Sequence, residues 1–279
     1  MRLKEDVKLT ERVVHGPALH YVSFLPDAPK AFVGLLHGYA DHAARYAHVQ
    51  QAWAERGIAS VALDMRGHGR AEGRRGYCAR FEEFLDDARE LERLVADRAG
   101  AAPRFLVGHS FGGLVAASVA LADPKPWKGL VLSSPYFGLA LAVPGAKLFA
   151  AKIASAILPT LAVPSGLTGK DLTHDAARGR LYDEDPLVFK KATTRWFVEA
   201  KRAQATALAA AHSLALPLYV LFGEADPVAA MSAGKAFYES AGSKDKTWDG
   251  RPGLLHETLN EPEWPAIAGA IADWILARA

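Results

Sequence analysis

Short runs made almost entirely of apolar residues recur along this chain, with enough residues between them for a helix. Five such runs, rich in residues that favour strands, cover residues 31–36, 58–63, 104–107, 129–132 and 218–222. Runs that lack alternation of polar and apolar residues are typical of parallel strands buried on both faces. The chain is therefore predicted to build a mostly parallel sheet.

Helical periodicity appears between several of these runs. It is clearest at seven apolar positions spaced three and four apart, which form one face opposite a charged face: Phe81, Phe84, Leu85, Ala88, Leu91, Leu94 and Val95. Residues 111–121, 228–240 and 264–277 also fit helices, and residues 7–14 and 18–25 fit an antiparallel hairpin at one edge. The alternation of strand and helix predicts an α/β fold with helices on both faces of the sheet.

One interval is too long for a single crossover. Residues 134–217 separate two predicted strands, whereas a crossover between parallel strands needs a helix and two loops. Within the interval, 137–164 is apolar with proline and glycine breaks, 165–185 is polar, and 189–211 fits a helix. We expect a core domain of residues 1–136 and 212–279, and a mainly helical cap of residues 137–211, here called the cap segment.

Composition narrows the classes of function. Half of the 279 residues are hydrophobic and 23% are charged, as in ordinary globular domains, and the formal net charge is only +2. A balance of this kind gives no reason to expect nucleic-acid binding. The single cysteine, Cys78, can form no disulfide within the chain. Neither a signal peptide nor an uninterrupted apolar span is apparent, so we expect a cytoplasmic protein.

A Gly-x-Ser-x-Gly pattern lies between the third apolar run and the helix after it. Ser110 is its central serine, in the sequence Gly108-His109-Ser110-Phe111-Gly112. A serine on a sharp strand-to-helix turn needs small neighbours, and the helix N-terminus favours developing negative charge. The alternative is a glycine-rich turn whose serine only caps a helix. The placement favours Ser110 as a nucleophile.

A nucleophilic serine needs a base to take its proton and an acid to orient that base. Asp226 lies just past the last apolar run, in the sequence Gly223-Glu224-Ala225-Asp226, and His256 lies in a loop before the final helix. The chain order Ser, Asp, His is the one expected for a serine at such a turn. Competitors for these roles are the histidines His20, His48 and His212 and the acids Glu224, Asp249 and Glu257. Asp226 could also be merely an Asp-Pro turn.

The tetrahedral intermediate of acyl transfer needs two hydrogen-bond donors for its oxyanion. The backbone N–H of Phe111, directly after the nucleophile, is one candidate. The backbone N–H of Tyr39 is the other, because His37-Gly38-Tyr39 leaves the first buried strand and Gly38 allows close backbone approach. A tight strand exit with no ligand is the alternative for His37 and Gly38.

Five segments in one order resemble the α/β-hydrolases of the monoacylglycerol lipase and lysophospholipase-like group. They are His37-Gly38-Tyr39 with Asp41-His42 and Arg45-Tyr46, then 64–69, 108–113, 223–226 and 256–261. The resemblance covers nearly the whole chain and implies the same nucleophile, acid, base and oxyanion donors. Two positions depart from the family pattern: Ala71, where a serine is common, and Tyr39, where a smaller residue or phenylalanine is common.

These residues together predict a serine hydrolase that cleaves carboxylic esters of monoacylglycerols or similar lipids and needs no cofactor or metal. Thioesterase, lysophospholipase, amidase or acyltransferase chemistry and a non-catalytic ligand-binding role are the alternatives on the same fold. The acidic run around His174 and 183–185 fits solvated loops better than a metal site, and 64–69 fits a structural turn. The cap segment is also expected to contact a membrane surface through Leu139, Leu141, Val143, Leu148 and Phe149, with Lys147 and Lys152 in water. An apolar cap face that packs on the core domain or on a second subunit is the alternative.

Overall fold

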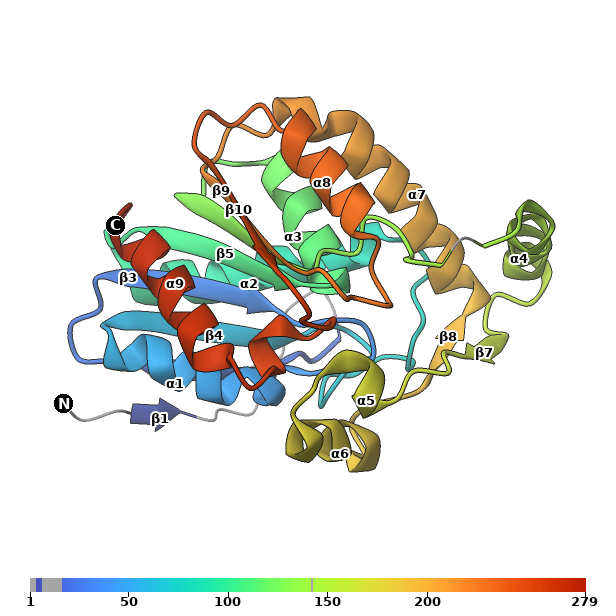
Figure 1. Ribbon diagram of the computed structural model, residues 1–279, viewed down its shortest axis with the longest axis horizontal. Helices are drawn as coiled ribbons and strands as arrows, with labels where there is room; N and C mark the ends of the chain where they lie inside the picture. The colour runs from blue at the N-terminus through green and yellow to red at the C-terminus, as the bar shows by residue number, and fades with distance from the viewer. Residues whose placement is uncertain (1–3, 7–16, 142) are drawn as a thin grey trace.

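The computed structural model describes residues 4–6, 17–141 and 143–279 (Figure 1). Within these residues, one sheet has eight strands in the order β1-β2-β4-β3-β5-β6-β9-β10. The strands are β1 (Lys4–Asp6), β2 (His20–Leu25), β3 (Ala31–Leu36), β4 (Ile58–Asp64), β5 (Arg104–His109), β6 (Gly129–Ser133), β9 (Leu218–Gly223) and β10 (Lys246–Arg251). The five apolar runs are β3, β4, β5, β6 and β9, which confirms the predicted parallel sheet.

The two strands at the amino-terminal edge run antiparallel to their neighbours. β2 pairs with β4 and with β1. The strand predicted at 7–14 lies outside the described residues. At the other edge, β10 pairs in parallel with β9. This strand carries no apolar run, because as an edge strand it is only half-buried along its whole length.

Helices cover both faces of the sheet. One face is covered by α1 (Ala47–Glu55) and α9 (Trp264–Leu276), and the other by α2 (Glu82–Ala99), α3 (Phe111–Ala122) and α8 (Met231–Ser240). Short 3-10 helices lie at η1 (Ala43–Tyr46) and η3 (Thr258–Asn260). The strip Phe84, Ala88, Leu91 and Val95 of α2 is buried as its spacing predicts. A mostly parallel sheet with helices on both faces confirms the predicted α/β architecture.

The cap segment contains several short elements instead of one crossover helix. They are α4 (Gly145–Ile157), β7 (Ala162–Pro164), α5 (Gly169–Leu172), α6 (Ala176–Glu184), β8 (Lys191–Thr193), α7 (Thr194–Ala210) and the start of η2 (Ala211–Ser213). β7 pairs antiparallel with β8, and α4 packs on α7. Figure 1 places α4 at the end of the molecule farthest from the chain termini.

The helix predicted at 189–211 begins later than the sequence pattern indicates. β8 takes residues 191–193 into the small sheet, and the Thr193 hydroxyl then caps α7 by accepting from Trp196 N. From there α7 packs against α3 and α8 of the core. In the described part of the chain, no helix has both the length and the apolar character required to cross a bilayer.

Candidate active site

Ser110 occupies a sharp turn between β5 and α3. Its backbone has φ 52° and ψ −117°, a left-handed conformation that a non-glycine residue adopts only under strain. The turn leaves no space for side chains beside it. A Cβ at Gly108 would collide with the carbonyl of Gly112, and one at Gly112 would collide with the carbonyl of His37. Both glycines of the pattern are therefore needed to present the hydroxyl.

The strand order brings the other candidate residues to the same edge of the sheet. β3 and β5 are neighbours with Leu36 opposite Gly108, so the segment after β3 emerges beside Ser110. β6 lies between β5 and β9 in the sheet, and its Ser133 is opposite Leu221 of β9. The loop that follows β9 and carries Asp226 therefore emerges at the same edge. Residues far apart in sequence meet here because parallel strands end on one side.

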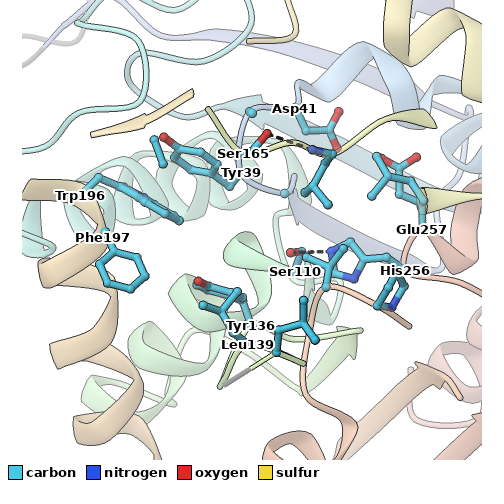
Figure 2. A pocket seen from close by; sticks show the side chains of 18 of the residues that line it. Tyr39, Asp41, Ser110, Tyr136, Leu139, Ser165, Trp196, Phe197, His256 and Glu257 are labelled. Carbon is cyan, nitrogen blue, oxygen red and sulfur yellow. Dashed lines mark hydrogen bonds between the residues drawn. The ribbon is translucent and has the colours of Figure 1, made fainter. Parts of the chain in front are cut away.

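The side chains of Ser110, His256 and Asp226 form one hydrogen-bonded chain. His256 Nδ1 lies 2.7 Å from Asp226 Oδ2. On the other side of the ring, His256 Nε2 lies 2.8 Å from Ser110 Oγ, and Figure 2 shows this second contact. A carboxylate can only accept, so Nδ1–H donates to Asp226 and leaves Nε2 to accept from the Ser110 hydroxyl. The structure thus brings together the three side chains proposed from the sequence, with His256 Nε2 facing the Ser110 hydroxyl.

The charges around His256 favour its protonated form. Burial alone would lower the pKa of the imidazole, but the charge and hydrogen bond of Asp226, with the charges of Glu257 and Asp41, raise it above the ordinary value of 6.5. Burial likewise favours the neutral acid at Asp226. The charge and hydrogen bond of His256 and the backbone N–H groups of Val228 and Ala229 outweigh burial and lower the pKa of Asp226 below its ordinary value. The two shifts together favour an ion pair between a protonated His256 and an ionised Asp226.

The competing residues make other contacts. Among the histidines, His20 pairs with Asp64, His48 lies 2.9 Å from the carbonyl of Leu259, and His212 contacts the carbonyl of Ala209.

Among the acids, Asp249 accepts from Tyr219 and Arg251, Glu257 pairs with Arg45, and Glu224 is exposed. Asp226 does form an Asp-Pro turn, because its Oδ1 accepts from Val228 N and Ala229 N, but its Oδ2 is directed at His256.

The two predicted oxyanion donors lie beside the serine. A Cβ on Gly38 would lie 3.4 Å from Ser110 Cβ, so the segment after β3 passes close to the Ser110 side chain. Tyr39 and Ser110 line the same cavity, and Phe111 begins α3. Among hydrogen bonds between described residues, none uses the backbone N–H of Tyr39 or of Phe111. Neither N–H group is therefore used by another described residue.

A cavity of about 420 Å³ opens above Ser110 and His256 between the core and the cap segment. Its wall is mainly apolar and comes mostly from the cap segment and the loops next to it (Figure 2). The wall residues include Tyr136, Leu139, Leu141, Val143, Leu167, Leu172, Trp196, Phe197 and Val228, with Lys147 among the few charged ones. Such a site suits a ligand with an apolar tail and a reactive polar group at Ser110.

A buried ion network supports the loops on either side of the site, and sequence reasoning did not identify it. Arg45 forms two hydrogen bonds to Glu257, at 2.7 and 2.6 Å, and a third at 2.9 Å to Asp41. Tyr46 donates to the other oxygen of Asp41 at 2.7 Å. The i, i+4 spacing of Asp41 and Arg45 indicates that these two residues can pair. Glu257 lies 212 residues after Arg45, so nothing in the local sequence indicates that it joins them.

Two further polar motifs, the turn at 64–69 and the acidic run of the cap segment, make contacts that stabilise the structure. In the turn at 64–69, Asp64 accepts from Ala43 N and Arg70 N, and Arg66 pairs with Asp87. The acidic run of the cap segment is divided among separate partners: His174 with Glu261, Asp183 with Lys190, and Asp185 with His42. The described residues contain no group of three His, Cys, Asp or Glu side chains arranged to hold a metal ion.

Comparison with known proteins places this geometry in a family. A family model described as serine aminopeptidase, S33 (Hydrolase_4) matches residues 27–263. The monoacylglycerol lipase of Mycolicibacterium smegmatis is 30% identical over 267 residues, covering 95% of each chain. A phospholipase of Bacillus subtilis is 31% identical over 241 residues, covering 85% of this chain and 92% of its own.

A solved structure agrees with the sequence comparisons. The crystal structure of Paleococcus ferrophilus monoacylglycerol lipase superposes with a TM-score of 0.83 at 27% identity, covering 94% of this chain and 99% of its own. The family match spans most of the chain, and the relatives align over nearly their whole length. The chain therefore belongs to the serine aminopeptidase S33 family and is a monoacylglycerol lipase-like carboxylic ester hydrolase with the α/β-hydrolase fold.

Proposed function

We propose that the protein hydrolyses monoacylglycerols through an acyl-enzyme on Ser110, with His256 as base, Asp226 as its partner, and the backbone N–H groups of Tyr39 and Phe111 as oxyanion donors. The observation that carries the proposal is the position of His256, whose two ring nitrogens lie 2.8 Å from Ser110 Oγ and 2.7 Å from Asp226 Oδ2. This arrangement allows one proton to pass from the serine to a substrate.

The proposed reaction has two steps, acylation of Ser110 and hydrolysis of the acyl-enzyme. Ser110 Oγ attacks the ester carbonyl carbon while its proton moves to His256 Nε2, and the carbonyl electrons move to the oxygen held by the two N–H groups. The oxyanion then collapses, the bond to the glycerol oxygen breaks, and His256 returns its proton to that oxygen. Water attacks the acyl-enzyme in the same way and releases the fatty acid. Asp226 stays ionised throughout.

The cavity and the relatives support a substrate with one acyl chain. At about 420 Å³, its volume lies near the lower end of the ~300–1,000 Å³ found for ligand pockets, which suits one chain better than three. Two of the proteins to which this chain is similar are named monoacylglycerol lipases. We therefore expect monoacylglycerols to be hydrolysed faster than diacylglycerols or triacylglycerols.

We also propose that residues 137–211 act as a cap that contacts a membrane surface. Phe149, Ile153 and Ile157 are spaced four apart on one face of α4, and all three are exposed, Phe149 at 66% and Ile157 at 71%. Leu141, shortly before α4 in the sequence, is 80% exposed. Exposed apolar side chains gathered on one helix are typical of an interaction surface. Leu158, Leu161 and Val163 extend the same exposed stretch.

Not every residue predicted for this contact takes part. Leu139 packs against the core and lines the cavity, and Val143 and Leu148 are only partly exposed. Lys147 and Lys152 are exposed on α4, as expected of amines that stay in water. The proposed surface therefore consists of Leu141, Phe149, Ile153, Ile157, Leu158, Leu161 and Val163.

The decisive experiment replaces the nucleophile. Ser110→Ala is expected to remove hydrolysis of a monoacylglycerol and of a p-nitrophenyl ester while the thermal unfolding midpoint stays near that of wild type. The matched control is Ser118→Ala, the same change on α3, where the hydroxyl donates to the carbonyl of Leu114. Wild-type turnover by Ser110→Ala would refute the assignment.

A lysophospholipase activity is the second candidate, since one relative is named a phospholipase. The test measures hydrolysis rates on four substrates of one acyl-chain length: a monoacylglycerol, a lysophospholipid, an acyl-CoA thioester and an aryl amide. The fastest substrate distinguishes monoacylglycerol lipase, lysophospholipase, thioesterase and amidase activities. Labelling by a fluorophosphonate probe separates all of these from a non-catalytic binding protein, because an unactivated serine would not react.

A further inference from the structure

The side chain of Tyr39 leaves the loop beside the nucleophile and enters the cap segment. Its ring stacks on that of Trp196 in α7, with 3.7 Å between centroids and 29° between planes (Figure 2). The ring of Phe189, just before β8, meets it edge-on at 5.3 Å. Tyr39 is also a position at which this chain departs from its family pattern. One residue thus has its backbone at the active site and its ring in the cap segment.

The phenol oxygen of Tyr39 adds polar contacts to the same region. It donates to the carbonyl of Lys191 in β8 at 3.0 Å and lies 3.3 Å from the carbonyl of Gly76. The Gly76 carbonyl also accepts from the Thr193 hydroxyl at 2.6 Å, and that hydroxyl in turn accepts from Trp196 N at the start of α7. Tyr39, β8 and the first turn of α7 therefore form one connected contact, here called the Tyr39 contact.

The backbone on both sides of Tyr39 is fixed by other groups. Before it, the His37 imidazole accepts from Met65 N at 3.0 Å and contacts the carbonyl of Gly38 at 2.7 Å. After it, Ala40 has φ 61°, a conformation that a non-glycine residue keeps only when its surroundings impose it. Asp41 is then held by Arg45 and Tyr46. The Gly38 carbonyl and the Tyr39 N–H belong to one planar peptide unit, so His37 holds one end of that unit. The side chain of Tyr39 holds its Cα at the other end, and the two anchors together determine where the N–H points.

We propose that Tyr39 is a positioning residue, whose side chain ties the loop beside the nucleophile to β8 and α7 and so holds its own N–H in place for the oxyanion. This inference rests on the proposed function, because it assumes that the Tyr39 N–H meets the oxyanion. It implies that the site is fully competent only while β8 and the first turn of α7 are docked on the core.

A purely packing role for the ring predicts a different kinetic result. If Tyr39 served only as a wall of the cavity, its alteration would change substrate binding and therefore KM or acyl-chain preference. If it positions the N–H, the loss falls on the transition state and therefore on kcat, because the neutral substrate carbonyl gains less from that donor than the oxyanion does.

The test compares Tyr39→Phe with Tyr238→Phe. Tyr238 is a matched control, because it also donates to a backbone carbonyl at 3.3 Å, that of Lys246, but does not line the cavity. Removal of an oxyanion donor lowers kcat by about 10²–10³-fold, so its displacement in Tyr39→Phe is expected to lower kcat by roughly tenfold. KM is expected to stay within about twofold of wild type, and Tyr238→Phe is expected to match wild type in both constants.

Inhibitor binding gives a readout that a general structural defect would not reproduce. A long-chain trifluoromethyl ketone forms a tetrahedral adduct with the serine, whose oxyanion needs the donors, whereas a monoalkyl glycerol ether cannot. Tyr39→Phe is expected to lose affinity for the ketone by the same factor as it loses kcat/KM, and to keep its affinity for the ether. Equal losses for both ligands, or a change in KM alone, would overturn the proposal.

A second variant breaks the Tyr39 contact from the side of the cap segment. Thr193→Val removes the hydroxyl that donates to Gly76 but leaves Tyr39 unchanged. If both residues act through one contact, the double variant loses no more than the worse single variant; multiplied losses would contradict the proposal. Thr193→Val also tests the inference if Tyr39→Phe fails to fold. A wild-type enzyme without esterase activity would instead refute the proposed function itself.

Discussion

The imidazole of His256 is buried among three carboxylates, and this environment determines how the reaction should depend on pH. Asp226, Glu257 and Asp41 raise its pKa above 6.5 despite burial. Because His256 must be neutral to accept the Ser110 proton, kcat/KM should rise with pH through this raised pKa. The same shift stabilises the folded state at pH values below 6.5, and this contribution is lost as pH rises through the folded pKa.

Replacement of Asp226 by asparagine tests this account. Asp226→Asn removes the charge, and because the amide oxygen stays with Val228 N and Ala229 N, an NH2 donor faces Nδ1 in place of an acceptor. The acid limb of the kcat/KM profile should therefore move to lower pH while kcat falls by roughly 10³–10⁴-fold. Full pH profiles of both proteins measure the two effects. Asp245→Asn, which alters a carboxylate paired with Arg278, is the control and should leave the profile unchanged. An acid limb at the same pH in Asp226→Asn would contradict the assigned source of the shift.

At the scale of residues, the candidate site could be predicted because each member has a local signal. Ser110 stands in a glycine pattern after an apolar run, and Asp226 follows another such run. The Tyr39 contact could not be predicted, since nothing in the sequence around Tyr39 indicates that its ring stacks on Trp196, 157 residues later. Contacts between segments far apart in the sequence depend on how the cap segment docks, which periodicity does not encode.

At the scale of elements, Arg45 joins η1 to the loop that carries His256. Its side chain is only 9% exposed and forms hydrogen bonds with Glu257 and Asp41. A buried pair of this kind adds little over an apolar replacement of all its members, but removal of one member leaves the others charged and desolvated. The two loops are thus coupled through a group that is costly to remove.

Arg45→Met should therefore destabilise the fold strongly. Removal of one member of a buried ion pair costs about 3–5 kcal/mol, and we expect a decrease of this size in the free energy of unfolding measured by urea denaturation. Arg93→Met is the control, because Arg93 pairs with Glu90 and Asp97 on the exposed face of α2, where ion pairs contribute about 0–1 kcal/mol. Equal losses in the two variants would show that burial of the pair does not matter.

Some helices and strands have a sequence pattern that predicts them, and others do not. Residues 31–36 were predicted to the residue as β3, since every position of that strand is buried and apolar. β10 was missed because Lys246–Arg251 forms a half-buried edge strand of mixed polarity. The start of α7 was placed five residues early, because pairing of β7 with β8 overrides the helical periodicity of residues 189–193.

At the scale of the whole molecule, the sheet positions the reactive groups and the cap segment provides much of the cavity wall. Figure 1 shows α4 at the far end of the cap segment, away from the helices that cover the sheet. The wall residues Leu141 and Val143 precede α4 directly, and Leu141 also belongs to the proposed membrane surface. Leu141 therefore belongs both to the proposed membrane surface and to the cavity wall, and the exposed Lys147 of α4 also lines the cavity.

This arrangement predicts that membrane binding and chemistry can be separated by mutation. The double variant Phe149→Ser and Ile157→Ser removes two exposed apolar side chains that do not line the cavity. Full burial of one such side chain is worth about 1.5–3 kcal/mol, so partial burial of both should make vesicle affinity at least about tenfold higher in wild type than in the variant. Co-sedimentation with phosphatidylcholine vesicles measures the difference, and the rate on a short water-soluble ester should stay unchanged.

Leu181→Ser, at a position on α6 that is 66% exposed, is the control and should bind vesicles as wild type does. The same vesicle binding by all three proteins would mean that the exposed face of α4 does not contact the membrane.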